Sequence, residues 1–241
     1  MTSAASDDAP PSPLERGAAA VALLLAGGAG TLTAGMWPDN VVWLPAWIAA
    51  TAVYVALAWG LWQGRAWARA LGLGVALFGL AGWIEAWIVA GTSPTTVAAS
   101  LAHCAFAPLL FWAPRRVGGR HGFALLAAGA ALQPALGFAL APAQSGGTMA
   151  AVLAGAGLVV LGAIGVARGR TWGLLGALLG APVLAAAVFY APSLGFLTAP
   201  HPHLPANPVM LDLLGALAAG FAALSVAPWV APMVGFLRGG R

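Results

Sequence analysis

The hydrophobic positions of the chain are grouped in long runs that are separated by short polar stretches. A helix that crosses the hydrocarbon core of a bilayer needs about 20 mostly apolar residues, and windows of this kind occur eight times. The pattern predicts an all-α, polytopic integral membrane protein with eight transmembrane helices. These helices are expected near residues 17–36, 41–63, 68–91, 96–113, 122–141, 149–167, 172–197 and 208–236.

The polar stretches between the runs are of two alternating kinds. All ten basic residues are Arg, and they lie before the first predicted helix or after the second, fourth, sixth and eighth. The other connections, including the longer segment 198–207, contain no Arg. Cytoplasmic loops carry the excess of basic residues in membrane proteins. Both termini are therefore predicted to be cytoplasmic. The helices are expected to cross the cytoplasmic (inner) membrane.

Composition excludes several other classes of protein. The 241 residues are 61% apolar and 7% charged, with 11 Trp and a mean hydropathy of +0.90, whereas soluble domains carry about 25% charged residues. The Arg residues are dispersed, so they do not form the basic face of a nucleic-acid-binding protein. Cys104 is the single cysteine, so no intrachain disulfide can form. We expect the lipid bilayer as partner, with a homo-oligomer or a larger membrane complex as further candidates, and no cofactor.

The two halves of the chain share a short motif. Residues 1–16 are predicted to be a disordered cytoplasmic tail, and residues 17–119 and 120–241 would each hold four helices. At an offset of 105, Gly64-Arg65-Ala66-Trp67 aligns with Gly169-Arg170-Thr171-Trp172. The match suggests a 4+4 internal duplication in which both halves have the same orientation. Interfacial anchoring would also select an Arg-Trp pair at a membrane boundary, so both explanations stay open.

Gly176 and Gly180 form a GxxxG pair in the seventh predicted helix. Small residues allow helix backbones to approach closely inside a membrane. The pair predicts packing against another helix of the same chain, in preference to a dimer face.

Three ionisable side chains fall inside predicted spans: Glu85, His103 and Asp212. Each is costly to insert, by roughly 2.5 to 3.5 kcal/mol near the bilayer centre, so such groups tend to be functional. Glu85 and His103 are each nine residues from Pro94 in their predicted connecting loop, which places them at a matched depth of roughly 13 Å. A carboxylate–imidazole pair is therefore predicted, and the three residues are candidate proton carriers.

Weaker polar groups and aromatic rings extend this candidate site. Trp83 and Trp87 flank Glu85, and Tyr190 is the counterpart of Glu85 in the second half. These residues and Gln133 are candidates for substrate binding, and Tyr54 and Cys104 are further polar groups within spans.

The outer connection between the last two predicted helices contains His201 and His203, a candidate metal site. Pro202 favours an extended geometry at His201 that need not bring the two imidazoles together. An exposed loop without metal is therefore the favoured interpretation, and the metal site is the weaker one.

Three classes of function agree with this pattern. A proton- or cation-coupled transporter for a small solute is the leading hypothesis, because intramembrane acids and His form proton relays. A membrane-embedded enzyme acting on a lipid or isoprenoid, such as an acid-initiated cyclase, is the second. It would use Glu85 as general acid and the flanking Trp rings to stabilise a carbocation. A structural or assembly subunit of a membrane complex is the third, so enzymatic activity is left open.

Overall fold

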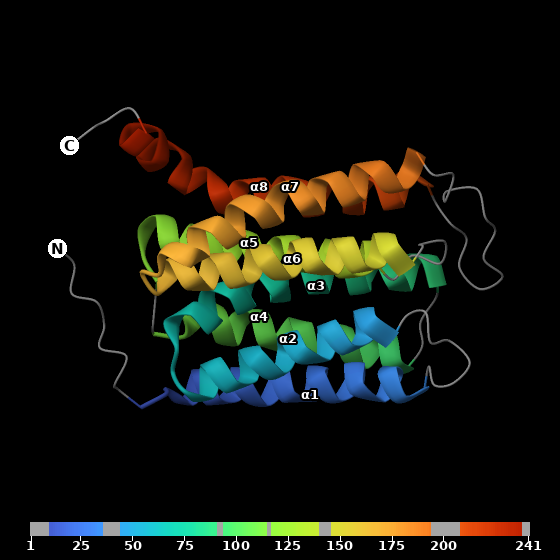
Figure 1. The fold of residues 1–241 in the computed structure, drawn as a ribbon. Helices are drawn as coiled ribbons and strands as arrows, with labels where there is room; N and C mark the ends of the chain where they lie inside the picture. Colours follow the sequence, from blue (N-terminus) through green and yellow to red (C-terminus); the bar gives the residue numbers. More distant parts are fainter. Residues whose placement is uncertain are drawn as a thin grey trace. The chain divides into compact units, whose positions relative to one another are not determined.

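The described residues of the computed structural model, 10–35, 44–90, 94–114, 117–139, 146–193 and 208–237, form eight α-helices and no strand. The helices match the predicted ones in number and order (Figure 1). They are α1 (Pro13–Gly35), α2 (Leu44–Trp62), α3 (Ala66–Ala90), α4 (Pro94–Trp112), α5 (Gly119–Ala139), α6 (Gly146–Ala167), α7 (Thr171–Ser193) and α8 (Pro208–Leu237). The prediction of an all-α fold is confirmed.

Four of the described helices contain stretches long and apolar enough to cross a membrane: Leu44–Trp62, Met149–Ala167, Thr171–Val188 and Leu214–Pro232. Large apolar side chains on these helices are exposed, among them Ile48, Leu161 and Leu179. Such surfaces suit contact with lipid, and an α-helix satisfies its own backbone hydrogen bonds there. These features indicate a membrane protein.

The first helix begins earlier than the predicted start at residue 17. The Ser12 hydroxyl accepts a hydrogen bond from the Glu15 N–H (3.2 Å), and the Glu15 carboxylate accepts one from the Ser12 N–H (2.7 Å). This reciprocal pair is a capping box, and Pro13 occupies the first helical position, where its missing N–H costs nothing. Residues 13–16, predicted to belong to a disordered tail, are therefore helical.

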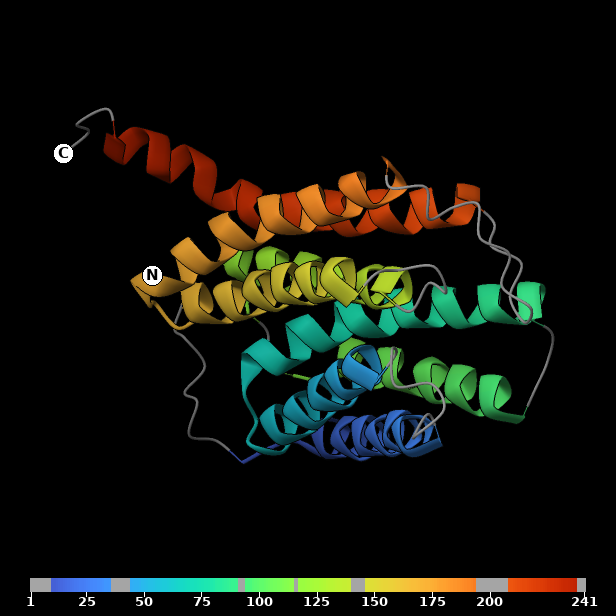
Figure 2. The ribbon, with the colours of Figure 1, turned by 45° about the vertical axis from the view of Figure 1, so that its right-hand side comes forward.

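The chain divides into two compact units, Met1–Val117 and Gly118–Arg241. In the first unit, α1 and α3 each pack against both α2 and α4, which gives a closed ring of four helices (Figures 1 and 2). The contact between α1 and α2 is the most extensive. The largest side chains in the buried core of this unit include Leu57, Leu61, Val75, Phe106 and Leu110.

In the second unit, α5 and α7 each pack against both α6 and α8, so the ring has the same order of neighbours. Here the contact between α6 and α7 is the most extensive. Helix α8 contains Pro228 and Pro232 and bends towards its C-terminal end (Figures 1 and 2). A proline inside a helix removes a backbone donor and permits such a bend.

Glycines make the contact between α6 and α7. A Cβ atom added at Gly155 would lie 2.7 Å from the backbone nitrogen of Leu184, and one added at Gly162 would collide with the backbone nitrogen of Ala177. The two backbones therefore touch directly, which only residues without a side chain allow.

The GxxxG pair belongs to this contact. A Cβ atom at Gly180 would lie 2.6 Å from the backbone nitrogen of Val159, and one at Gly176 would lie 3.3 Å from the Cα of Gly162. The prediction that this pair packs within the chain is confirmed.

Helix α2 ends in a Schellman motif, in which a residue of positive φ follows the helix, and the N–H groups of that residue and of the next one satisfy the last carbonyls. Gly64 has a φ of +64° and donates to the Leu61 carbonyl (2.9 Å), and Arg65 N–H donates to the Gly60 carbonyl (2.7 Å). The ring of Trp67 lies over Gly60, where an added Cβ would be 2.8 Å from it.

Helix α6 ends in the same way. Gly169 has a φ of +69° and donates to the Val166 carbonyl (2.9 Å), and Arg170 N–H donates to the Gly165 carbonyl (2.9 Å). The ring of Trp172 lies over Gly165, 2.9 Å from the position of an added Cβ. The motif shared by the two halves of the sequence therefore forms the same local structure twice.

Candidate functional site

The first unit contains a hydrogen bond between two buried side chains. Tyr54 lies on α2 and His103 on α4, and the Tyr54 hydroxyl oxygen is 2.9 Å from His103 Nε2. Tyr54 is 6% exposed and His103 is 1% exposed. The two rings meet edge to face, with centroids 6.0 Å apart and an interplanar angle of 74°. Because α2 and α4 are opposite members of the helix ring, the pair lies across the inside of the unit.

The second nitrogen of the imidazole fixes its tautomer. His103 Nδ1 lies 2.8 Å from the backbone carbonyl oxygen of Ala99, one turn earlier in α4. A carbonyl can only accept, so Nδ1 carries the hydrogen. In the neutral ring, Nε2 then has a lone pair and accepts the hydrogen bond from the Tyr54 hydroxyl. Both nitrogens of a neutral His103 are therefore satisfied.

Tightly packed residues surround His103 on α4. Ser100 and Phe106, one turn to either side of His103, are 2% and 0% exposed. Gly72 of α3 faces the same helix, and a Cβ added there would lie 3.1 Å from Leu110 and 3.6 Å from Phe106. The imidazole is thus held among close-packed helices, a setting in which a charge is expensive to form.

A buried arginine holds the C-terminal end of α4. Arg69 of α3 is 8% exposed, and its Nη2 donates to the backbone carbonyl of Phe111 (2.8 Å). The last carbonyls of a helix lack intrahelical partners, and a cation next to them is favourable. In the sequence, Arg69 indicates only the topology of the chain in the membrane. Its side chain also fixes α3 to α4, the helix that carries His103.

The predicted partner of His103 lies on α3. Glu85 and the flanking Trp83 and Trp87 are helical residues of this element, which packs against α4. Their side chains are outside the described part of the structure. The Glu85–His103 pair therefore stays a prediction.

The remaining predicted site residues belong to the second unit. Gln133 is half-buried on α5. Tyr190 lies on α7 and Asp212 on α8, and their side chains are outside the described part. Their proposed roles in proton transfer and substrate binding stay predictions.

The candidate metal ligands His201 and His203 are also outside the described residues. Among the side chains that are described, no three His, Cys, Asp or Glu residues gather as a metal-ligand set. Cys104 is exposed, whereas the adjacent His103 is buried.

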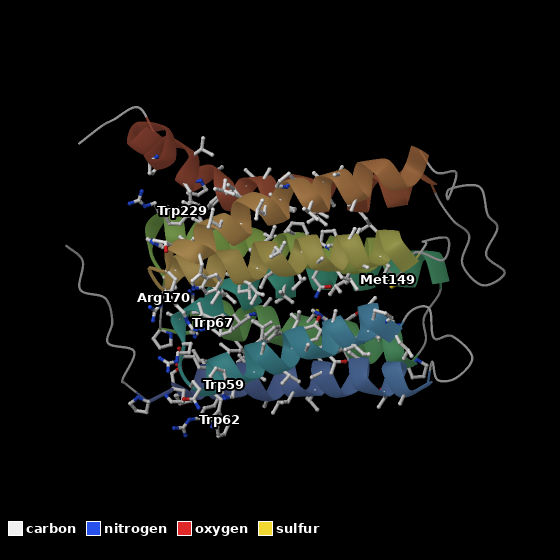
Figure 3. The ribbon with its side chains drawn as sticks, in the orientation of Figure 1. Trp59, Trp62, Trp67, Met149, Arg170 and Trp229 are labelled. Atoms are coloured by element: carbon white, nitrogen blue, oxygen red, sulfur yellow. The ribbon has the colours of Figure 1, made fainter. Side chains whose placement is uncertain are left out.

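A second polar contact lies at the start of α5. The His121 ring meets Trp229 of α8 edge to face, with centroids 4.8 Å apart, and the guanidinium carbon of Arg120 lies 5.4 Å from the Trp229 ring centroid. Partial burial, and secondly the charge of Arg120, lower the pKa of His121. This contact joins α5 to α8 at the end of the unit that also carries Arg170 (Figure 3).

The sequence contains a signal for the contact between Tyr54 and His103. Helices α2 and α4 start on the same predicted side of the membrane. Tyr54 lies about three turns into α2 and His103 about two and a half turns into α4. Tyr54 and His103 therefore lie at a similar depth, as Glu85 and His103 do.

Comparisons with known proteins supply no identity for the chain. No family model matches it, and no curated protein or solved structure is significantly similar to it.

Proposed function

We propose that this protein is a transporter that couples movement of a small solute to a proton or another cation, with His103 and Tyr54 as its proton-binding site. The supporting observation is the buried Tyr54–His103 hydrogen bond inside a bundle of apolar helices. Ionisable side chains are rare in membrane helices, and those present often carry protons in pumps and transporters. Histidine suits this task because it changes charge close to physiological pH.

Proton binding would alter the contact between α2 and α4. The proton adds at Nε2, because Nδ1 already carries the hydrogen held by the Ala99 carbonyl. Nε2 then becomes a donor, so the Tyr54 hydroxyl must turn and accept instead of donate. The hydroxyl hydrogen stays on Tyr54 but no longer points at Nε2, so it needs another acceptor. Proton binding thereby favours a different arrangement of the two helices, and a two-state element of this kind is what coupling requires.

The charge formed on His103 also has to be stabilised. An unpaired ion in a protein interior costs several kcal/mol, more than one hydrogen bond to a neutral tyrosine returns. The protonated site would therefore favour an arrangement that admits water or an anionic group. The carboxylate of Glu85, on the neighbouring helix α3, is the predicted anionic group.

Reconstitution in liposomes tests the proposal. Vesicles containing the protein and an internal pH-sensitive dye would be offered solutes by class: amines, organic acids, sugars and metal ions. We expect at least one class to change the internal pH, and we expect His103→Gln to abolish the change and Tyr54→Phe to reduce it. Ser225→Ala, which removes a buried hydroxyl from the second unit, should retain the wild-type rate. Coupled flux that persists in a folded His103→Gln variant would overturn the proposal.

We further propose that all eight helices span the inner membrane and that both termini are cytoplasmic. Arg16, Arg120, Arg168 and Arg170 are exposed, and the predicted topology places all four at cytoplasmic helix ends. On a Cys104→Ala background, a cysteine at Gln63 should be protected from an impermeant maleimide in intact cells. A cysteine at Ala199 should react, and the reverse pattern would invert the topology.

We also propose that the two units arose by internal duplication. Both have the same order of neighbouring helices, and both contain the same turn. Interfacial anchoring explains an Arg-Trp pair at each turn, but it does not explain why Trp67 and Trp172 each lie over a glycine of the preceding helix, Gly60 and Gly165. A shared origin explains the Arg-Trp pair and this glycine together.

The other two classes of function receive less support from the described residues. The enzyme hypothesis depends on Glu85, Trp83 and Trp87, whose side chains are outside the described part. A docking subunit would need a helix face for its partner, and the GxxxG pair Gly176 and Gly180 is already used against α6.

A further inference from the structure

We infer that the turn between α6 and α7 binds the head group of an anionic phospholipid. Arg168 and Arg170 lie on either side of Gly169 in this turn, and both are exposed. The helices that the turn joins each contain a stretch able to cross a membrane. A connection this short between two spanning helices has to lie at the membrane surface, level with the lipid phosphates.

The indole of Trp172 also indicates that the turn lies at the level of the lipid phosphates. Trp172 is 53% exposed, and its ring lies over Gly165 at the end of α6. Because Gly165 has no side chain, the ring can rest against the helix pair in a fixed place. An amphipathic ring at an exposed helix end is typical of the membrane–water interface. The two guanidiniums therefore lie beside an interfacial anchor.

The chemistry of the turn favours a lipid with net negative charge. A guanidinium can donate two parallel hydrogen bonds to phosphate oxygens. Residues 146–193, which comprise α6, the turn and α7, contain no Asp or Glu, so the charge that these elements carry is positive. Basic groups at a membrane surface attract anionic head groups more strongly than zwitterionic ones. Phosphatidylglycerol should therefore bind in preference to phosphatidylcholine.

The corresponding turn of the first unit has the same backbone but a different surface. Gln63 stands at the position of Arg168, and Arg65, the counterpart of Arg170, is half-buried. Trp67 is also half-buried, whereas Trp172 is exposed. The α6–α7 turn, and not the α2–α3 turn, therefore has the charge and the access that a head group requires.

Native mass spectrometry of the full chain, released from nanodiscs with equal amounts of phosphatidylglycerol and phosphatidylcholine, tests this inference. We expect the wild type to retain the anionic lipid preferentially. The ratio of retained phosphatidylglycerol to retained phosphatidylcholine should fall about fivefold in Arg170→Gln, and about a further fivefold in Arg168→Gln/Arg170→Gln. Arg16→Gln removes one exposed charge at another helix end and serves as the matched control. It should behave as the wild type, and thermal midpoints confirm that all variants are folded.

Two outcomes would overturn the inference. The first is a wild-type lipid ratio in the double variant, and the second is an equal loss in Arg16→Gln, which would indicate a general surface charge instead of a site. Excess inorganic phosphate separates a lipid site from a phosphate-ion site, because bound phosphatidylglycerol should survive it. Displacement by phosphate would overturn the lipid assignment. None of these variants touches His103, so the result is independent of the transport assay.

Discussion

The two units have the same order of neighbouring helices but fill the space between the helices differently. At an offset of 105, three glycines of the α6–α7 contact correspond to larger residues in the first unit: Leu57, Leu71 and Val75. In agreement with this difference, α6 and α7 pack far more extensively than α2 and α3. The second unit brings backbones into contact, whereas the first separates α2 and α3 with side chains.

This difference bears on where long polar and titratable side chains can be buried. Tyr54 and Arg69 of the first unit correspond to Val159 and Leu174 of the second. Backbone-to-backbone packing leaves no volume for a titratable side chain, whereas packing through side chains does. The described part of the first unit accordingly holds a buried Tyr54–His103 pair and a buried Arg69. One arrangement of helices therefore holds a core of touching backbones in one unit and buried polar side chains in the other.

Replacing a glycine of the second unit with the residue at the corresponding position of the first unit should cause the largest loss of stability. Gly162→Leu installs the side chain of Leu57 where a Cβ already collides with the backbone of Ala177. We expect a loss of about 3 kcal/mol or more in unfolding free energy, measured by denaturation in detergent micelles. The control is Gly157→Leu on the same helix, because nothing lies within 4 Å of an added Cβ there. Equal losses in both variants would show that the glycine contact is not special.

Breaking the buried polar pair should have the next largest effect. Tyr54→Phe removes the donor to His103 Nε2 and leaves a buried acceptor unsatisfied, which should cost about 1–3 kcal/mol of unfolding free energy. A double-mutant cycle with His103→Phe should show coupling of more than about 0.5 kcal/mol, since the two side chains share one hydrogen bond. Additive losses would mean that the hydrogen bond does not contribute.

The two Schellman turns should respond alike, even though their surroundings differ. Gly64 and Gly169 have φ values of +64° and +69°, and a Cβ in this region costs roughly 1–2 kcal/mol. We therefore expect similar losses of stability for Gly64→Ala and Gly169→Ala. Gly220→Ala, in an open position within α8, should be neutral or stabilising by up to about 1 kcal/mol. Strongly unequal losses at the two turns would count against their equivalence.

The smallest expected effect is a pH dependence that arises in the second unit. The pKa of His121 is lowered in the folded protein by burial and by Arg120, so the unfolded chain binds more protons. Stability attributable to this residue should therefore fall as the pH drops below about 6.5, and should level off below the folded pKa. Thermal midpoints between about pH 7.5 and 5.5 would be compared for the wild type and His121→Gln. An unchanged slope in the variant would contradict the assignment.

Much of the architecture could be predicted from the sequence, because apolar length and the placement of Arg follow directly from the properties of a bilayer. The helices, their order and the intrachain use of Gly176 and Gly180 were all predicted. The start of α1 is also indicated by the sequence, since Ser12 and Glu15 have the spacing of a capping box.

The candidate site could be predicted only in part from the sequence. His103 was identified because an ionisable group in a span is unusual. Its hydrogen bond to Tyr54 and the contact of Arg69 with the end of α4 depend on which helix faces meet. Depth along a helix can be counted from sequence, but rotation about the helix axis cannot.

The sequence by itself determined that this chain forms apolar helices of membrane-spanning length, because hydrophobicity and helix geometry act locally along the chain. Only the tertiary structure decided which side chains meet: it joined Tyr54 to His103 and brought the backbones of α6 and α7 into contact. The reason is that helix association in lipid has no strong hydrophobic driving force and depends on the close fit of particular surfaces. Such a fit depends on the positions of several helices at once, and no single stretch of sequence encodes it.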